Sequence, residues 1–193
     1  SSSSDDCEVT SVTWTEASGN INNDNIKFFY SLKPFNCFPK KLEKFFKNLD
    51  TIEFGYPNFT ILKSDLQPFG SQLKMFWFHH SKLEVIAADL FEYTTNLEFL
   101  YLNYNKITHV QQGAFSKLTK LTTLRFNGNP CHSGIAINNR AAFNSLITQI
   151  ESKCIDEEAF RRYKNQLMPT TTTTTSTTTE RNYADELSTC NKV

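Results

Sequence analysis

The stretch Leu97-Glu98-Phe99-Leu100-Tyr101-Leu102-Asn103-Tyr104-Asn105-Lys106-Ile107 decides the fold, because it fits the pattern LxxLxLxxNxL. The pattern restarts at Leu121 and occurs earlier at Leu73, at equal spacing on the two sides of Leu97. A further copy begins at Leu49, and a degraded copy is visible in the apolar residues Phe28, Tyr30, Phe35 and Phe38. Unrelated amphipathic segments would not keep one period over this length, so the chain is predicted to consist of stacked repeat units.

The spacing within each unit predicts its local structure. The alternating LxLxx part is typical of a short strand whose leucines point inward, and the remainder returns the chain along the other side. A single unit cannot bury its apolar face, whereas stacked units share a continuous core. We therefore expect an α/β solenoid of about five 24-residue coils, with a parallel sheet on the concave side. The 17 phenylalanines of the chain are expected to fill places that leucine fills elsewhere.

On this motif the chain resembles the extracellular leucine-rich-repeat family, over about residues 7–154. The Phe-rich composition and the few cap cysteines are similar to insect secreted immune proteins of that family. The repeat receptors of jawless fish are also similar, although they carry more cap cysteines. The chain departs from the family in the column of turn asparagines, which reads Lys33, Pro57, Ser81, Asn105 and Asn129. The resemblance implies a less regular turn in the first three units.

The five cysteines favour closed ends and an oxidising compartment. None belongs to a CxxC pair, and their positions favour two local disulfides, Cys7–Cys37 and Cys131–Cys154. Cys190 is left over, which favours an interchain disulfide; the alternatives are a free thiol or a partner cysteine outside this sequence. Asn58-Phe59-Thr60 is an N-glycosylation sequon. These features together predict a secreted glycoprotein.

The domain organisation follows from where the repeats stop. We expect a capped repeat domain over 1–154, with an N-terminal cap at 7–48, repeats at 49–128 and a C-terminal cap at 129–154. Helical spacing from about Asn139 to Ile150 predicts a helix in that cap. A charged helix is expected over 155–168, docked on the cap or paired with another chain. Residues 169–193 form a Thr-rich stretch that buries nothing and is expected to be a disordered stalk.

The candidate binding site lies on the expected concave face, where the variable strand residues point outward. An aromatic patch is centred on the third and fourth units, and Glu53 and Arg125 flank it. Exposed aromatic clusters mark interaction sites, and Trp, Tyr and Arg are frequent energetic anchors. The alternative is that a tail or cap of the chain covers this face. The candidate ligand-binding residues are Phe29, Glu53, Tyr56, Met75, Trp77, His79, His80, Phe99, Tyr101, Tyr104 and Arg125.

No sequence feature favours catalysis. The motifs HExxH, GxSxG, GxGxxG and the P-loop are absent from the sequence, and no cofactor or metal is expected. His79 and His80 are adjacent on a strand edge and should diverge, while His109 and His132 are expected to be exposed.

Charge and hydropathy bound the partners. Lys+Arg and Asp+Glu balance at 20 each, which does not favour nucleic acid. The sequence contains no apolar run of about 18 residues, so no membrane-spanning helix is expected. We expect a secreted, non-enzymatic recognition protein that binds a protein or glycan ligand, with a role in innate immunity. The alternative is a structural or adhesive extracellular protein that self-associates.

Overall fold

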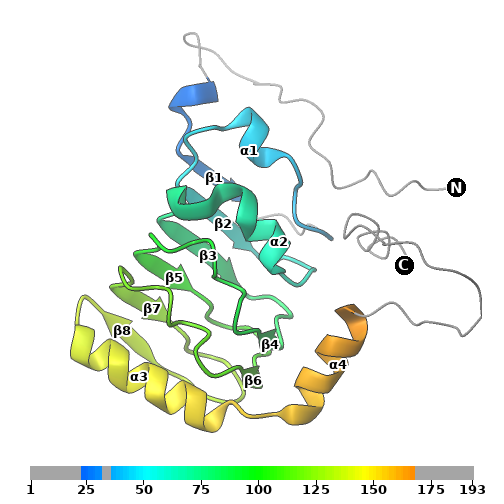
Figure 1. The fold of residues 1–193 in the computed structure, drawn as a ribbon, viewed down its shortest axis with the longest axis vertical. Helices are drawn as coiled ribbons and strands as arrows, with labels where there is room; N and C mark the ends of the chain where they lie inside the picture. Colours follow the sequence, from blue (N-terminus) through cyan, green and yellow to red (C-terminus); the bar gives the residue numbers. More distant parts are fainter. Residues whose placement is uncertain (1–22, 32–35, 168–193) are drawn as a thin grey trace, which may run out of the picture.

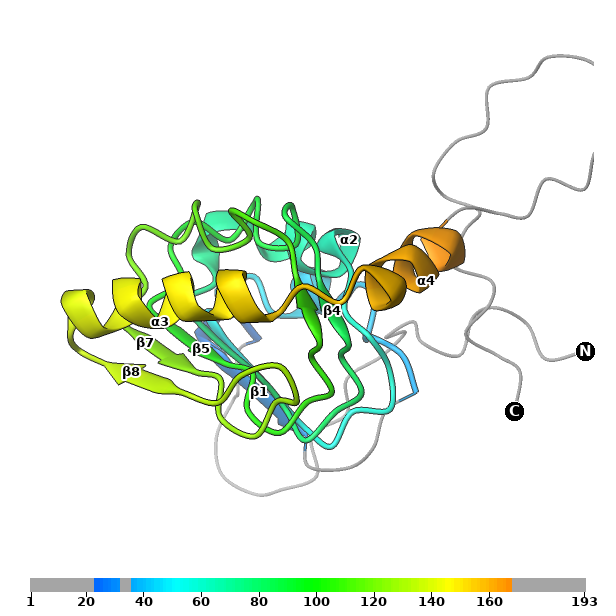
Figure 2. The ribbon, with the colours of Figure 1, turned by 90° about the horizontal axis from the view of Figure 1, so that it is seen from below.

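The computed structural model describes residues 23–31 and 36–167 of the chain. A six-stranded sheet forms one side, and the segments that return from strand to strand form the other (Figure 1, Figure 2). The strands of this sheet, in spatial order, are β1 (Phe28–Ser31), β2 (Thr51–Gly55), β3 (Met75–His79), β5 (Phe99–Tyr101), β7 (Thr123–Arg125) and β8 (Ile135–Ile137). The first five are parallel, and β8 pairs antiparallel to β7.

The return side contains shorter elements. A second, two-stranded parallel sheet pairs β4 (Val85–Ile86) with β6 (His109–Val110). The helices are η1 (Asn23–Asn25), α1 (Leu42–Phe45), α2 (Lys63–Leu66), η2 (Gln67–Gln72), α3 (Arg140–Lys153) and α4 (Glu157–Leu167). The mostly parallel sheet of short strands confirms the coarse fold expectation. A complete five-coil solenoid with two disulfide caps stays a prediction.

The strand register repeats the sequence period. Thr51 pairs with Met75, Met75 with Phe99, and Phe99 with Thr123, so each partner lies one full repeat further along the chain. This register places the apolar strand residues in two fully buried columns, each at most 1% exposed. The columns are Ile52, Phe76, Leu100 and Leu124, and Phe54, Phe78, Leu102 and Phe126. The expected inward columns are confirmed for these four units.

The first unit departs from the expected register by a single position. Phe29 pairs with Ile52 and Tyr30 with Glu53, whereas the sequence period would pair Phe28 with Ile52. Because strand side chains alternate, a shift by one position exchanges the two faces. Phe29 consequently packs on the core against Phe54, with ring centroids 5.8 Å apart, while Phe28 and Tyr30 are 47% and 60% exposed. The prediction that Phe29 lies on the outward face was wrong.

Phenylalanine fills the core in the first half of the stack. The buried rings of Phe38, Phe54, Phe59 and Phe78 contact one another at centroid distances between 5.4 and 6.5 Å, with interplanar angles from 64° to 81°. Such tilted and edge-on arrangements suit the aromatic quadrupole and add to area burial. In the units that begin at Leu97 and Leu121, leucine and isoleucine predominate, and Phe115 and Phe126 are the buried phenylalanines there.

Side-chain amides join successive units at the turn. Asn105 is buried, and its Nδ2 donates to the carbonyls of Phe78 (2.7 Å) and Leu102 (3.1 Å), while its Oδ1 accepts from the Leu83 amide. Asn129 repeats this arrangement one unit later. Ser81 is a shorter substitute, and its Oγ donates to the carbonyls of Pro57 and Phe59. The side chains of the turn column therefore stabilise the stack by forming hydrogen bonds with backbone groups that are buried between units.

The C-terminal end of the core is closed by β8 and α3. The Asn139 side chain caps α3 by accepting from the Ala142 amide at 2.9 Å. Phe143, Leu146 and Ile150 on one face of α3 are buried against the last units. The disulfide Cys131–Cys154 ties the two ends of this cap, as predicted. The predicted cap helix is α3, which extends to Lys153.

The α4 helix lies on the return side beside β4 and β6 (Figure 1). The segment leading into it continues the backbone pairing, because Val110 donates to the Cys154 carbonyl at 2.8 Å and His109 bridges to Ile155. The imidazole of His109 stacks on Phe160 of α4, with centroids 4.7 Å apart. His109 is only 4% exposed, so the expectation that it faces solvent was wrong. His109 is buried because β6 pairs with the chain after Cys154, which brings α4 and its Phe160 ring against the imidazole.

Several expectations lie outside the described residues. These are Cys7 and hence the Cys7–Cys37 pairing, the Thr-rich segment at 169–193, Cys190 and the turn residue Lys33. The division into domains stays a prediction. Among the helices that the structure does describe, none has the length and apolarity that crossing a membrane requires.

Asn105→Ala should lower the free energy of unfolding by about 2–4 kcal/mol, because it removes three hydrogen bonds and leaves buried backbone groups unpaired. Urea denaturation measures this change. The matched control is Asn103→Ala, since Asn103 is half-buried on the outward face and should change stability by less than about 0.5 kcal/mol. Equal losses in the two variants would contradict the role given to the turn amides.

The register of β1 gives a second prediction. Phe29→Ala should destabilise the fold by about 2–3 kcal/mol, because it empties a place in the core. Phe28→Ala should change stability by less than about 1 kcal/mol, since its side chain faces outward. Thermal and urea unfolding of the two variants give the comparison. A larger loss of stability in Phe28→Ala than in Phe29→Ala would show that β1 instead keeps the register of the sequence repeat.

Candidate functional site

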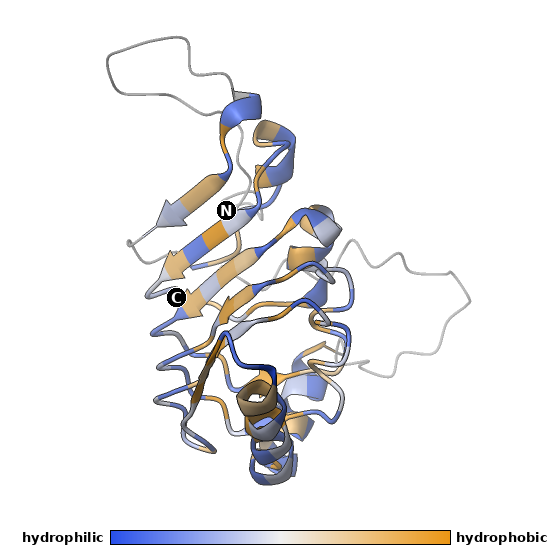
Figure 3. Ribbon diagram, turned by 90° about the vertical axis from the view of Figure 1, so that its left-hand side faces the viewer, coloured by the Kyte–Doolittle hydropathy of each residue, from blue (hydrophilic) through white to orange (hydrophobic). Residues whose placement is uncertain are grey.

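The outward-facing side chains of the six-stranded sheet form what we term the outer sheet face. In β3 the burial alternates, with Phe76 and Phe78 fully buried and Met75, Trp77 and His79 half-buried. The parallel register sets the outward residues of neighbouring strands side by side, so that Glu53, Trp77, Tyr101 and Arg125 form one row across the sheet. Figure 3 shows the strands side by side, with hydrophobic residues recurring along them.

Aromatic contacts hold the centre of the outer sheet face. The rings of Trp77 and Tyr101 meet edge to face, with centroids 4.8 Å apart and an interplanar angle of 74°. Met75 and Phe99 pair directly beside them and are also half-buried. The guanidinium of Arg125 lies over the Tyr101 ring at 5.0 Å, a favourable cation–π contact. The Trp77 indole Nε1 is buried and has no hydrogen-bond partner among the described residues.

Glu53 and His79 form a polar pair beside this centre. The His79 Nε2 lies 3.4 Å from Glu53 Oε1, and both side chains are largely buried, with 19% of the His79 surface and 14% of the Glu53 surface exposed. Glu53 thus contacts His79 instead of standing free as a charge at the edge of the patch. Arg125, by contrast, is exposed and remains accessible to a ligand. Within the described residues no group of three or more His, Cys, Asp and Glu side chains is arranged to hold a metal ion.

A second column of rings lies where each strand ends. Tyr56, His80 and Tyr104 stack in sequence, with centroids 5.0 Å and then 4.5 Å apart. All three have positive φ angles, of 65°, 54° and 54°, and Gly128 continues the column with φ 76°. Residues other than glycine seldom adopt this conformation, and such backbone strain concentrates at functional sites. Burial and the neighbouring His79 lower the pKa of His80, which favours the neutral imidazole in this stack.

The structure brings together most of the expected ligand-binding residues. Ring contacts connect His79 to Tyr56 and to His80, while Trp77 contacts Tyr101. The prediction that His79 and His80 diverge was wrong, because their rings meet edge to face with centroids 5.4 Å apart and an interplanar angle of 76°. Phe29 is not part of this surface, because it faces the core. Asn58 is exposed, and its Nδ2 donates to Asn36 Oδ1 at 3.2 Å.

Sequence reasoning missed four apolar residues at the margins of the outer sheet face. Phe28 and Tyr30 stack on each other at 5.5 Å at the β1 margin. At the other margin Ile135 and Ile137 are each 50% exposed, and they pair with Arg125 and Thr123. The alternation Ile135-Ala136-Ile137, with Ala136 buried, was the available signal for this strand. The signal is short and lies inside the predicted cap.

Residues 71–130 match the leucine rich repeat family. The matched segment begins before β3 and ends at Pro130, so it contains Met75, Trp77, Tyr101 and Arg125 and both turn asparagines. No similar protein was found among curated proteins. Leucine-rich repeats are typically non-catalytic and suggest protein binding. No enzyme family was found to match the chain.

The column of Tyr56, His80 and Tyr104 predicts that position 128 must be glycine. A Cβ atom at Gly128 would lie 2.4 Å from the Tyr104 ring, whereas at Gly113 the nearest atom would be 3.9 Å away. Both glycines have positive φ, so alanine strains the backbone at either position. Gly128→Ala should therefore lower the free energy of unfolding more than Gly113→Ala, by an additional ~1–2 kcal/mol. Urea denaturation of the pair tests this, and equal losses would show that the Tyr104 ring moves aside without cost.

Proposed function

We propose that this protein is a non-enzymatic recognition protein that binds a protein ligand on the outer sheet face of its leucine-rich repeats. The single observation that carries the proposal is the row of Trp77, Tyr101 and Arg125. Each side chain of this row contacts the next through a ring or cation–π contact, and all three are at least partly exposed to solvent. Solvent-facing strand positions usually carry small polar residues. A contiguous aromatic surface with an arginine at its edge has the composition of an interaction hot spot.

The chemistry of the surface supports a protein ligand over a glycan. In the column of Tyr56, His80 and Tyr104, both faces of the His80 ring are covered by its two neighbours, and Gly128 lies against the Tyr104 ring, so few open ring faces remain there. Open ring faces are what a stacked sugar would need. Apolar side chains at both margins, Phe28 and Ile137 among them, extend the surface in the way that protein interfaces combine aromatic and aliphatic contacts.

We further propose that the protein is secreted and acts in innate immunity, like the extracellular proteins that it resembles. The disulfide Cys131–Cys154 supports an oxidising compartment. The exposure of Asn58 within its sequon makes it accessible as a glycosylation acceptor. An interchain disulfide through Cys190, and a capped five-coil solenoid closed at its start by Cys7–Cys37, belong to the same proposal.

The test compares three single variants. Trp77→Ala and Tyr101→Ala should each weaken the binding of a protein ligand by roughly 1–3 kcal/mol, because each removes a central anchor. Tyr93→Ala is the matched control: Tyr93 is 38% exposed and lies between β4 and β5, outside the six-stranded sheet. The ligand is first selected from extracellular fluid on the immobilised wild-type protein, and then purified and titrated by calorimetry.

The outcomes are distinct. Loss of affinity in both sheet variants, with folding and the Tyr93→Ala affinity unchanged, is the expected result. A ligand bound equally by all four proteins would remove the outer sheet face as the site. Selection of glycans alone would overturn the protein-ligand assignment.

Self-association is a second candidate function, because β8 is the last strand of the sheet and exposes Ile135 and Ile137. Sedimentation velocity of the Cys190→Ser variant distinguishes it, because this variant cannot form the proposed interchain disulfide and keeps Cys131–Cys154. Higher-order species that dissociate in Ile137→Thr would favour the adhesive or structural role, and a monomer at all concentrations would exclude it.

A further inference from the structure

A cleft of about 620 Å³ lies on the return side, away from the outer sheet face. Its walls come from the end of α3, from β6 with the residues that follow it, and from the start of α4. Val110, Ile155 and Phe160 supply apolar surface, and Ile155 is 62% exposed. The volume lies in the range of ligand-binding clefts, which are commonly about 300–1,000 Å³.

The charged groups that line the cleft are of one sign. Glu151 and Glu157 are its two acidic residues, and no lysine or arginine lines it. Neither carboxylate forms an ion pair with a described residue, although Glu151 Oε1 accepts a hydrogen bond from the Gly113 amide at 2.9 Å. Polar neutral groups, among them Gln111 and Ser152, complete the lining. This lining attracts a cation and repels an anion.

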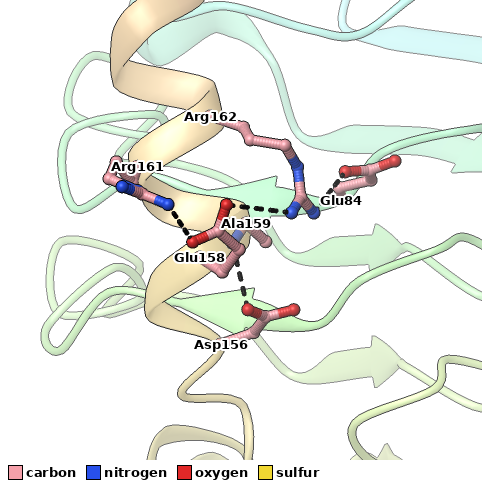
Figure 4. A network of polar contacts seen from close by, with 6 residues as sticks. All are labelled: Glu84, Asp156, Glu158, Ala159, Arg161 and Arg162. Carbon is pink, nitrogen blue, oxygen red and sulfur yellow. Dashed lines mark hydrogen bonds and ion pairs between the residues drawn. The ribbon is translucent and has the colours of Figure 1, made fainter.

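The neighbouring acidic side chains differ, because each already has a partner. Glu158 forms ion pairs with Arg161 and with Arg162, and Arg162 also reaches Glu84 at 3.6 Å (Figure 4). Asp156 caps α4 by accepting from the Ala159 amide at 3.0 Å. Glu151 and Glu157 are thus the carboxylates of this region that keep their charge available for a ligand.

A buried histidine supplies the second, independent observation. His109 lines the cleft and is 4% exposed, and its Nδ1 has no hydrogen-bond partner among the described residues. Its ring is held flat against Phe160, at an interplanar angle of 4°. A buried polar nitrogen without a partner is unfavourable, and an N–H group of a ligand would supply the missing hydrogen bond.

We propose that this cleft binds a basic side chain, lysine or arginine, presented by an extended segment of a protein partner. The aliphatic stem lies along Val110 and Ile155, and the cationic group is directed to Glu151 and Glu157. Peptide N–H groups adjoining the basic residue are the donors that His109 lacks. Three of the four polar neutral residues of the lining, Gln111, Gln112 and Ser152, carry groups that can bond to an extended peptide. This site is independent of the outer sheet face.

The experiment is an NMR titration of the ¹⁵N-labelled protein with the capped peptide acetyl-Gly-Lys-Gly-amide. Saturable shifts of the Gly113, His109 and Glu157 amide resonances are expected, and they should weaken as salt is raised. The matching peptide acetyl-Gly-Glu-Gly-amide should leave these resonances unchanged. Butylamine provides the cation without a peptide backbone and should bind more weakly than the lysine peptide.

Two charge-removing variants and one control locate the site. Glu151→Gln and Glu157→Gln should each weaken binding about fivefold, the effect of losing one partly exposed ion pair. Glu151→Gln retains an oxygen that can accept from Gly113, so the fold is preserved. Glu158→Gln lies in the same helical turn outside the cleft lining and should leave the affinity unchanged.

Absence of shifts with the lysine peptide would overturn the proposal. If Glu158→Gln weakened peptide binding as much as the two cleft variants do, binding would reflect general charge attraction. That result would also overturn the proposal. Binding of butylamine as tight as that of the peptide would overturn the assignment of a peptide partner. These outcomes do not bear on the outer sheet face, whose variants are titrated separately.

Discussion

Parallel pairing of strands at one constant register, which matches the sequence repeat, is the constraint on which the rest of the structure depends. With this register every inward residue meets its equivalent in the next unit, which produces the fully buried columns of the core. The same register places outward residues of successive units in contact, so that Trp77 meets Tyr101 and Tyr101 meets Arg125. The outer sheet face is therefore a direct consequence of the pairing, and the buried turn amides of Asn105 and Asn129 maintain that pairing.

The two sides of the stack are chemically different. The outer sheet face is aromatic, and its acidic residue Glu53 is paired with His79. On the return side α4 packs beside β4 and β6, and α3 and α4 each bring one carboxylate to a cleft whose lining holds no lysine or arginine. The disulfide Cys131–Cys154 joins the cap to the start of α4, and this positions the cleft next to the closed end of the core. The two surfaces that we propose as binding sites therefore differ in chemistry and lie on different sides of the stack.

The repeat period was sufficient to predict the inward columns and the parallel sheet, because repeated spacing reflects burial directly. Helical spacing predicted the cap helix, and the positions of the cysteines predicted one disulfide. It failed at β1, where Phe28, Phe29 and Tyr30 are all aromatic and their order does not reveal which residues face the core. The burial of His109 depends on the chain after Cys154, a contact between distant segments that local pattern does not encode. The left-handed conformation of Tyr56, His80 and Tyr104 was equally hidden, because glycine or asparagine normally signals it.

The most direct test of the central claim is hydroxyl-radical footprinting of the protein alone and in complex with its purified protein ligand. Partly exposed Met75, Trp77 and Tyr101 react with the radical, and their oxidation is quantified by mass spectrometry residue by residue. The account predicts that these three side chains are protected in the complex while Tyr93 reacts as before. Unchanged oxidation of Trp77 and Tyr101, with protection confined to the return side, would contradict the assignment of the outer sheet face as the principal binding surface.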